Sequence, residues 1–237
     1  MSSETFNKDN LDMIFKELAK EYKKLGGKAV PAEIILIGGA AIIENYGFRD
    51  MTTDVDAVIE AASMIKDAVN HVGDRLNLPN GWLNDDFKKT ESYSSHLSEV
   101  SEYYRTFSGV LHIRTISAEY LIAMKLKSGR KYKNDLSDVV GILAEHKRDG
   151  KDISYEMIDA AMKKLYGGWD AVPQDSITFI RKLIERGDYE SIFKDIRDSE
   201  KQAKELLLDF ENKYPDVTNT ENVESILGAL KARKNQK

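Results

Sequence analysis

The sequence predicts a mixed α/β (α+β) fold: a small mixed sheet flanked by helices, followed by a helical C-terminal bundle. Three observations lead to this prediction. Short, continuously apolar runs that end at glycines indicate buried strands in the first half. Apolar residues at helical spacing lie between those runs, and after residue 140 only such helical stripes occur. We therefore expect a sheet core with its N-terminal helix over residues 1–130 and a helical domain over residues 131–237.

The composition limits the classes of function. The chain has 237 residues, of which 41% are hydrophobic and 32% charged, as in a globular protein with a substantial core. It has no cysteine, which excludes disulfides, thiol catalysis and Cys-ligated zinc, and its four histidines lack paired spacing. The net charge of −5 argues against a wide nucleic-acid-binding surface but leaves room for a local basic patch.

No membrane-associated segment is expected. No apolar run approaches the ~20 residues that a membrane helix needs. The first residues, Met-Ser-Ser-Glu-Thr-Phe-Asn-Lys, lack the basic start and apolar stretch of a signal peptide. We therefore expect a cytoplasmic protein without a membrane partner.

The chain opens with an amphipathic helix. Three lysines lie near its end, where cations complement the helix dipole, and Gly26-Gly27 follow as a stop signal. The apolar residues at helical spacing are Leu11, Ile14, Phe15, Leu18, Ala19, Tyr22 and Leu25.

A strand, a glycine turn and a short helix come next. The strand, Ile34–Ile37, is apolar throughout, as expected for a strand covered on both faces. Gly38 and Gly39 permit a sharp turn and close backbone approach. Residues 40–45 can then begin a helix whose free N–H groups point toward an anion, so the turn is a candidate phosphate site.

Two aspartates mark the second strand, Asp54-Val-Asp56-Ala-Val-Ile. Because strand side chains alternate between faces, both carboxylates project to the same side. Their natural partner is a hard divalent ion such as Mg²⁺, which binds carboxylates together with substrate phosphates. The pattern favours metal-assisted phosphoryl or nucleotidyl transfer. The alternative is an ordinary βαβ unit with two solvated aspartates.

These residues resemble the nucleotidyltransferase superfamily, whose core motif pairs an apolar-Gly-Gly turn with Asp-x-Asp. The stretch Arg49-x-x-Thr52-Thr53-Asp54-x-Asp56 is more closely similar to minimal, abortive-infection (AbiEii-like) toxin-type nucleotidyltransferases. The resemblance implies a nucleotidyltransferase-like sheet and a Mg²⁺-dependent transfer of NMP from a nucleoside triphosphate to an RNA or protein acceptor. It also implies a toxin of a bacterial toxin–antitoxin or phage-defence system, with an antitoxin protein as partner.

Beyond the core motif, a helix is expected over residues 65–76, followed by a turn-rich loop, 77–86. Trp82 in this loop either walls a base pocket, with Asn84 or Asp85 as a polar contact, or anchors the loop to the core. Residues 101–107 predict an edge strand and 110–116 a better strand. The resemblance implies a third carboxylate on this last strand in many superfamily members, whereas the chain offers only His112 and Arg114 there. The third acidic ligand either comes from elsewhere in the chain or is absent.

A Lys-x4-Arg-x4-Asp-x2-Asp pattern follows at Lys125, Arg130, Asp135 and Asp138, and looks like the later motifs of the toxin type. There, the resemblance implies, Lys125 faces the nucleotide phosphates and an acidic residue supports the site. An unpaired lysine among apolar neighbours is costly to bury, so an anionic partner is expected. The alternatives are a surface lysine at position 125 and a helix N-cap at Asp135.

The assigned roles are therefore as follows. The catalytic residues are Asp54, Asp56, Lys125 and Asp138, of which Asp138 orients Lys125 or assists metal binding. The nucleotide-binding residues are Gly38, Gly39, Thr53, Lys125 and Arg130. The Mg²⁺ ligands are Asp54 and Asp56.

Two alternative functions remain open. Nucleotidylation of an aminoglycoside-type small molecule would favour an acidic pocket, whereas an RNA acceptor would favour the basic cluster of residues 125–133. The acidic candidates are Asp85, Asp86, Glu99 and Glu102. The absent third carboxylate instead suggests a catalytically weak nucleotidyltransferase-like binding protein.

Overall fold

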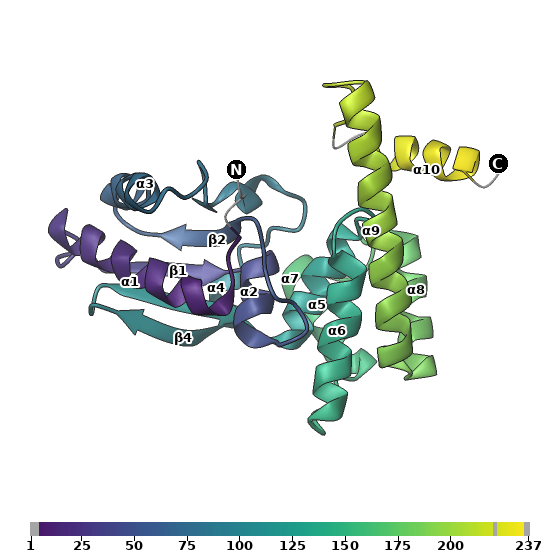
Figure 1. Ribbon diagram of the computed structural model, residues 1–237. Coiled ribbons are helices and arrows are strands. Elements are labelled where there is room, and N and C mark those ends of the chain that lie inside the picture. Colours follow the sequence, from purple (N-terminus) through teal and green to yellow (C-terminus); the bar gives the residue numbers. More distant parts are fainter. Residues whose placement is uncertain (1–4, 220–221, 235–237) are drawn as a thin grey trace. The chain divides into compact units, whose positions relative to one another are not determined.

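A computed structural model describes residues 5–219 and 222–234 (Figure 1). Contacts divide the chain into two compact units. The first, which we call the sheet unit, comprises residues up to Met124 together with Glu156–Trp169; the helical unit comprises Lys125–Tyr155 and the chain from Asp170 onward. The domain boundary expected at residue 130 falls between two helices and stays a prediction.

The sheet unit contains the expected small mixed sheet. Its strand order is β3-β2-β1-β5-β4, with β1 parallel to β5, β2 parallel to β3, and the other two pairs antiparallel. The strands are β1 (Ala32–Leu36), β2 (Val55–Glu60), β3 (Leu83–Asn84), β4 (Ser101–Phe107) and β5 (Leu111–Ile116).

Strand burial agrees with the sequence pattern. Ile34, Ile35 and Leu36 of β1 are fully buried although neighbouring side chains point to opposite faces, so the strand is covered on both faces as predicted. Strand β4 lies at the sheet edge, also as predicted, and exposes Glu102, Tyr103 and Arg105. A register shift between Tyr103 and Arg105 interrupts its pairing with β5. Such irregularities hinder edge-to-edge association of sheets.

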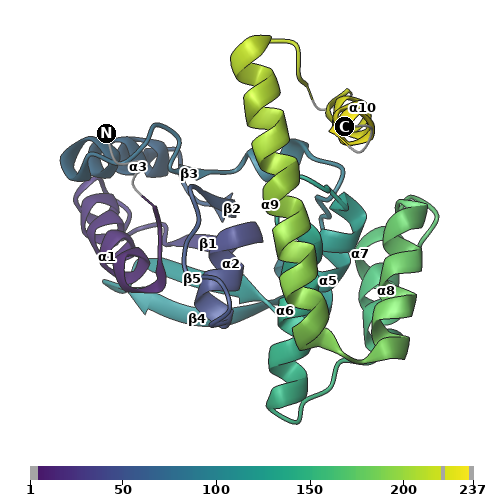
Figure 2. The ribbon, with the colours of Figure 1, turned by 45° about the vertical axis from the view of Figure 1, so that its right-hand side comes forward.

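The helices of the sheet unit begin with α1 (Lys8–Lys24), whose predicted apolar stripe is buried from Leu11 to Tyr22. Asn7 caps this helix in a reciprocal capping box with Asn10. Helix α1 packs beside α3 (Met64–Leu76), and Glu21 pairs with Arg75 across the contact at 3.0 Å (Figure 2). The remaining helices are α2 (Gly38–Asn45), the 3₁₀ turn η1 (Asp86–Lys89) and α4 (Leu97–Val100).

Residues Glu156–Trp169 also belong to the sheet unit. The sequence does not predict this return of the chain. The segment is formed mainly by α7 (Tyr155–Tyr166). The Ser94 hydroxyl donates to the Leu165 carbonyl at 2.7 Å, and the Tyr166 hydroxyl donates to the Ser92 carbonyl at 2.7 Å. These bonds fix the otherwise irregular stretch before α4.

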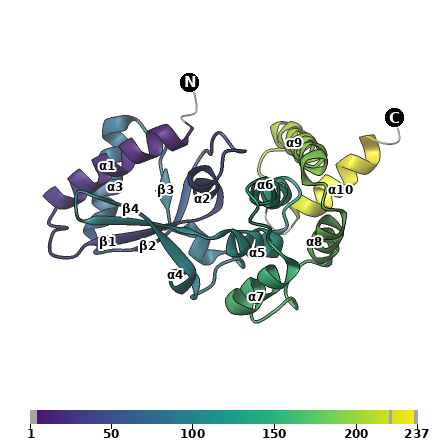
Figure 3. The same ribbon diagram turned by 90° about the horizontal axis from the view of Figure 1, so that it is seen from below.

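The helical unit confirms the helical C-terminal part. Helix α5 (Ala118–Ser128) enters it at Lys125, and α6 (Asp135–Arg148), α8 (Gln174–Arg186), α9 (Tyr189–Lys213) and α10 (Val223–Lys234) follow. Helices α6 and α9 lie side by side in all ribbon views (Figure 3). An apolar cluster that includes Leu207 and Leu227 joins α9 to α10. Within residues 5–219 and 222–234, no helix has the length and apolar character needed to cross a membrane.

Candidate active site

The glycine turn forms the beginning of α2. The helix starts at Gly38 itself rather than at residue 40. Gly38 has φ +56°, a left-handed conformation that glycine adopts without strain. Ile37 occupies the cap position and supplies no side-chain hydrogen bond. The first-turn N–H groups have no intrahelical partners, so the beginning of α2 can bind an anion.

Gly38 lies directly beside Asp56. A Cβ atom at position 38 would lie 3.3 Å from Oδ2 of Asp56, so the missing side chain leaves space next to this carboxylate. The antiparallel register of Leu36 with Ala57 causes the approach, and the Ile37 N–H donates to the Asp56 carbonyl at 3.1 Å. The two motifs are thus brought together by strand pairing.

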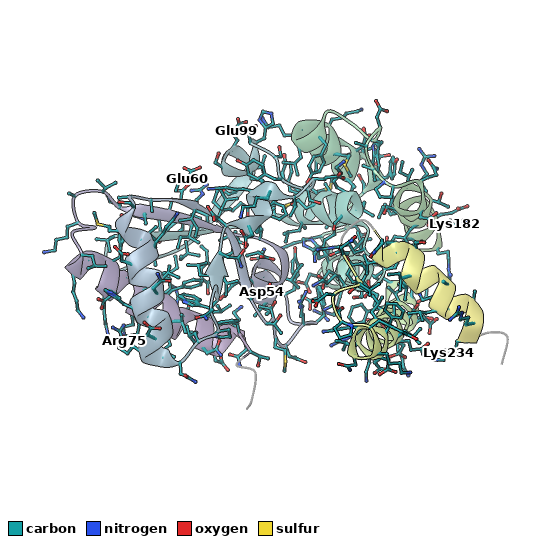
Figure 4. The ribbon with its side chains drawn as sticks, turned by 90° about the horizontal axis from the view of Figure 1, so that it is seen from above. Asp54, Glu60, Arg75, Glu99, Lys182 and Lys234 are labelled. Carbon is teal, nitrogen blue, oxygen red and sulfur yellow. The ribbon has the colours of Figure 1, made fainter. Side chains whose placement is uncertain are left out.

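Asp54 lies just before β2, and Figure 4 shows Asp54 and Glu60 at opposite ends of this strand. Asp54 is exposed and Asp56 half-buried, whereas Val55 and Ala57 are buried, which is the predicted alternation. The neighbouring Thr53 is exposed.

Thr52 supports this end of the strand. Its backbone pairs with that of Phe6 through hydrogen bonds of 2.7 and 2.8 Å. Its hydroxyl donates to Oδ1 of Asp54 at 3.5 Å. The N-terminal stretch before α1 therefore holds the aspartate motif in place.

Arg49 is a candidate site residue for which the sequence analysis predicts no role. A Cβ atom at Gly39 would lie 2.8 Å from Nη2 of Arg49 and 2.5 Å from the Thr52 hydroxyl. Position 39 therefore has no room for a side chain without displacing the guanidinium. Arg49 donates to the Met51 carbonyl at 3.1 Å and to the Thr52 hydroxyl at 3.5 Å. It adds a cation at the beginning of α2, and its place three residues before Thr52 in the motif is the only sequence signal for it.

Asp54 and Asp56 are the residues that could hold a magnesium ion, if a substrate supplied further ligands. Both are carboxylates, and the absent Gly38 side chain leaves a recess beside Asp56. Mg²⁺ is commonly held by one or two carboxylates together with substrate phosphates. Within the described part of the chain, no group of three or more His, Cys, Asp or Glu residues is arranged to hold a metal ion.

The β5 strand, where many relatives are expected to carry a third carboxylate, has its polar residues engaged elsewhere. Nδ1 of His112 lies 2.9 Å from the Thr106 hydroxyl. Arg114 donates to the hydroxyl and the carbonyl of Ser101, each at 2.6 Å. Both side chains therefore stabilise the β4–β5 hairpin.

Trp82 anchors its loop to the core, which decides between the two interpretations of this residue. It is 2% exposed, its indole N–H donates to the Val69 carbonyl at 3.1 Å, and its ring stacks on Phe6 at 6.1 Å. Asn84 pairs with Asp56 in the β2–β3 register. Its side-chain oxygen accepts from the Asp86 N–H at 3.1 Å, as in a turn.

The helical unit holds the second group of predicted residues. Lys125 is 8% exposed, and its ammonium lies 3.0 Å from Oδ1 of Asp135 and 2.7 Å from Oδ2 of Asp138. The alternative of a surface lysine is therefore wrong. The expected anionic partner is supplied by two buried carboxylates one helical turn apart.

Arg130 completes this buried charge cluster. Its Nε donates to Oδ2 of Asp135 at 2.8 Å, and its backbone N–H donates to the same atom at 3.3 Å. Although burial opposes ionisation, Lys125 and Arg130 hold the pKa of Asp135 well below its usual range. Asn134, not Asp135, occupies the cap position of α6, so the N-cap alternative for Asp135 is wrong.

The two proposed acceptor patches are both largely paired within their own units. In the basic cluster, Lys131 pairs with Asp175 at 2.7 Å and Lys127 donates to the Ala171 carbonyl at 2.6 Å. Among the acidic candidates, the ion pairs are Asp85–Lys88 at 3.5 Å, Asp86–Lys89 at 2.6 Å and Glu99–Lys164. Neither patch is a set of uncompensated charges.

The structure thus brings the predicted site residues together in two groups. Gly38, Gly39, Thr53, Asp54 and Asp56 belong to the sheet unit, whereas Lys125, Arg130 and Asp138 belong to the helical unit. Their assigned roles in catalysis and binding stay predictions.

Comparison with known proteins identifies the family. Residues 13–167, about two thirds of the chain, match the family described as "Nucleotidyltransferase of unknown function (DUF6036)". Comparisons with curated proteins and with solved structures gave no match. The matched span contains the glycine turn, the aspartate motif and the Lys125–Asp138 cluster. The chain belongs to this nucleotidyltransferase family.

Proposed function

We propose that the protein transfers a nucleoside monophosphate from a nucleoside triphosphate to an RNA or protein acceptor, with Mg²⁺ as cofactor. The observation that carries the proposal is the position of Gly38 beside Asp56: the first residue of α2 lies so close to this carboxylate that a Cβ atom at position 38 would be 3.3 Å from Oδ2. Triphosphate and metal would then meet at one point of the sheet unit.

The triphosphate would be held by the beginning of α2 and by Arg49. The N–H groups of Gly38 and Gly39 would supply directed donors, and the exposed Thr53 would add a hydroxyl. The Arg49 guanidinium lies where a Gly39 side chain would otherwise be, so it is close to the same donors. Arginine is suited to this role because its planar donor set matches phosphate oxygens.

Asp54 and Asp56 would hold the metal, which stabilises charge on the attacking and leaving oxygens when bound. In the proposed reaction the acceptor nucleophile forms a bond to the α-phosphorus, and its proton passes to water. The bond from the α-phosphorus to the bridging oxygen breaks, and pyrophosphate leaves. Thr52 contributes by fixing the Asp54 carboxylate.

Lys125 would neutralise negative charge on the phosphates, with Arg130 as a second cation and Asp138 orienting the ammonium. The 2.7 Å contact between Lys125 and Asp138 supports the orienting role. Because Asp135 and Asp138 already compensate the charge of Lys125, the lysine and its carboxylates would act on the phosphates as a fixed dipole and not as an isolated positive charge.

The toxin role and the antitoxin partner rest on the resemblance of the motif order at Lys125, Arg130, Asp135 and Asp138. The paired state of the basic cluster weighs against an extended RNA-binding patch there and favours a protein or a short RNA end as acceptor.

A nucleotide-binding protein without turnover is a second candidate. One observation favours it: the described residues contain no cluster of three potential metal ligands, and β5 supplies only His112 and Arg114 at the expected place of a third carboxylate.

The test is incubation of purified protein with Mg²⁺ and each α-labelled nucleoside triphosphate, with total RNA, cell protein and an aminoglycoside as separate acceptors. Asp54→Asn and Asp56→Asn keep the side-chain volume and remove the charge, and Asp74→Asn serves as a control at an exposed position of α3. We expect transfer by the wild type and the control, and none by the two site variants. Nucleotide binding without transfer to any acceptor would establish the second candidate instead.

A further inference from the structure

Glu200 of α9 caps a helix other than its own. Its side chain is buried, with 4% exposed, and Oε1 accepts hydrogen bonds from the N–H groups of Leu136 at 3.0 Å and Ser137 at 3.3 Å. These amides belong to the first turn of α6, whose cap residue Asn134 makes no side-chain cap bond. A carboxylate in this position satisfies orphan N–H groups and complements the positive end of the helix dipole.

The turn that Glu200 holds also carries the acidic residues of the candidate site. Asp135 precedes the two capped amides and Asp138 follows them, and both contact Lys125. Helices α6 and α9 pack along each other (Figures 1 and 3). A continuous path of contacts therefore runs from Glu200 through the first turn of α6 to the Lys125 ammonium.

Glu200 lies outside the region that defines the family. The family match ends at residue 167, whereas α9 spans Tyr189–Lys213. The C-terminal segment thus supplies a residue that supports three members of the matched region, Lys125, Asp135 and Asp138.

The two oxygens of the Glu200 carboxyl group have different surroundings. Oε2 of Glu200 is buried and has no hydrogen-bond partner among the described residues, and burial raises the pKa of Glu200 to about 7. A neutral glutamine could cap the same amides without the desolvation penalty of a charge. The acceptor oxygen Oε1, and not the charge, therefore holds the first turn of α6.

We propose that Glu200 is a positioning residue for Lys125: by holding the first turn of α6 it keeps Asp135 and Asp138 around the lysine ammonium. Its importance for transfer rests on the proposed function, but the positioning itself does not. The accessibility of Lys125 reports on positioning directly, whether or not the protein is an active transferase.

The experiment measures the rate at which an amine-reactive reagent modifies Lys125 in the full-length protein, by mass spectrometry, with exposed Lys133 as internal reference. Glu200→Leu keeps most of the volume and removes the acceptor, Glu200→Gln retains an acceptor oxygen, and Glu205→Leu is the control at an exposed position of the same helix. We expect a rise of about tenfold or more for Glu200→Leu, from local opening of the cluster, and rates near wild type for the other two variants.

If circular dichroism shows that Glu200→Leu does not fold, Glu200→Asp replaces it, because its shorter side chain cannot span the same gap; a raised rate is again expected. If Lys125 in a folded Glu200→Leu or Glu200→Asp protein is modified at the same rate as in the wild type, the proposal is overturned. Transfer assays on the same samples separate the two claims. Failure of the wild type to transfer would remove the proposed function and leave the Lys125 result standing, whereas transfer lowered only in Glu200→Leu would connect them.

Discussion

Replacing Asp135 by asparagine tests whether the buried charge cluster is a structural centre of the helical unit. The side chain of Asp135 is 0% exposed and is paired with the side chains of Lys125 and Arg130, which are themselves 10% and 43% exposed. Removing one partner of a buried ion pair costs about 3–5 kcal/mol. The half-exposed Arg130 contributes only ~0–1 kcal/mol, and Lys125 retains Asp138, so we expect a loss near the lower end, about 3 kcal/mol.

The assay is urea unfolding near neutral pH, followed by circular dichroism. The control is Asp175→Asn, which breaks the ion pair with Lys131 at a side chain that is 77% exposed and should cost only ~0–1 kcal/mol. The pKa of Asp135 is lowered on folding, so its contribution is fully present above the unfolded pKa and is lost as the pH falls through the folded pKa. The difference between wild type and Asp135→Asn should therefore shrink in acid. A loss no larger than that of the control would refute this reasoning.

Four further outcomes are expected. Gly38→Ala and Gly109→Ala should each cost ~1–2 kcal/mol of stability because both glycines have positive φ. Only Gly38→Ala should abolish transfer, since nothing lies within 4 Å of a Cβ at Gly109. Equal transfer by the two variants would contradict the proposed site. Arg49→Gln should weaken nucleoside triphosphate binding about tenfold or more, by loss of a hydrogen bond to a charged group, while nucleoside binding is unchanged in calorimetry. Trp82→Phe should cost ~0.5–1.5 kcal/mol in thermal unfolding through loss of the bond to the Val69 carbonyl. Glu200→Gln should gain stability relative to wild type as the pH rises, by up to about 3 kcal/mol, because the raised pKa of about 7 makes the wild-type contribution decline with pH; parallel pH profiles would exclude this titration.

Local patterns in the sequence predicted the sheet unit well. The apolar run before Gly38 and the alternation around Asp54 and Asp56 identified β1 and β2, because burial on both faces and a period of two leave direct traces. The predicted beginning of α2, residue 40, lies two residues after the observed one, Gly38. Gly38 adopts the left-handed conformation inside the first turn, which composition alone cannot indicate.

Contacts between distant segments account for what the sequence could not predict. The argument that Lys125 needs an anionic partner was correct because it rests on the cost of burying a charge, and the partners lie only 10 and 13 residues away. Glu200 caps amides 63 and 64 residues earlier, and no periodicity connects such positions. The return of α7 to the sheet unit was missed for the same reason.

The most direct measurement compares label from α-labelled and γ-labelled nucleoside triphosphate in the same transfer reaction. Transfer of a nucleoside monophosphate places the α-label on the acceptor and releases the γ-label in pyrophosphate. We expect this result for the wild type and for neither Asp54→Asn nor Asp56→Asn. Appearance of the γ-label on the acceptor, or α-label transfer that survives both substitutions, would contradict the assignment of this site to nucleotidyl transfer.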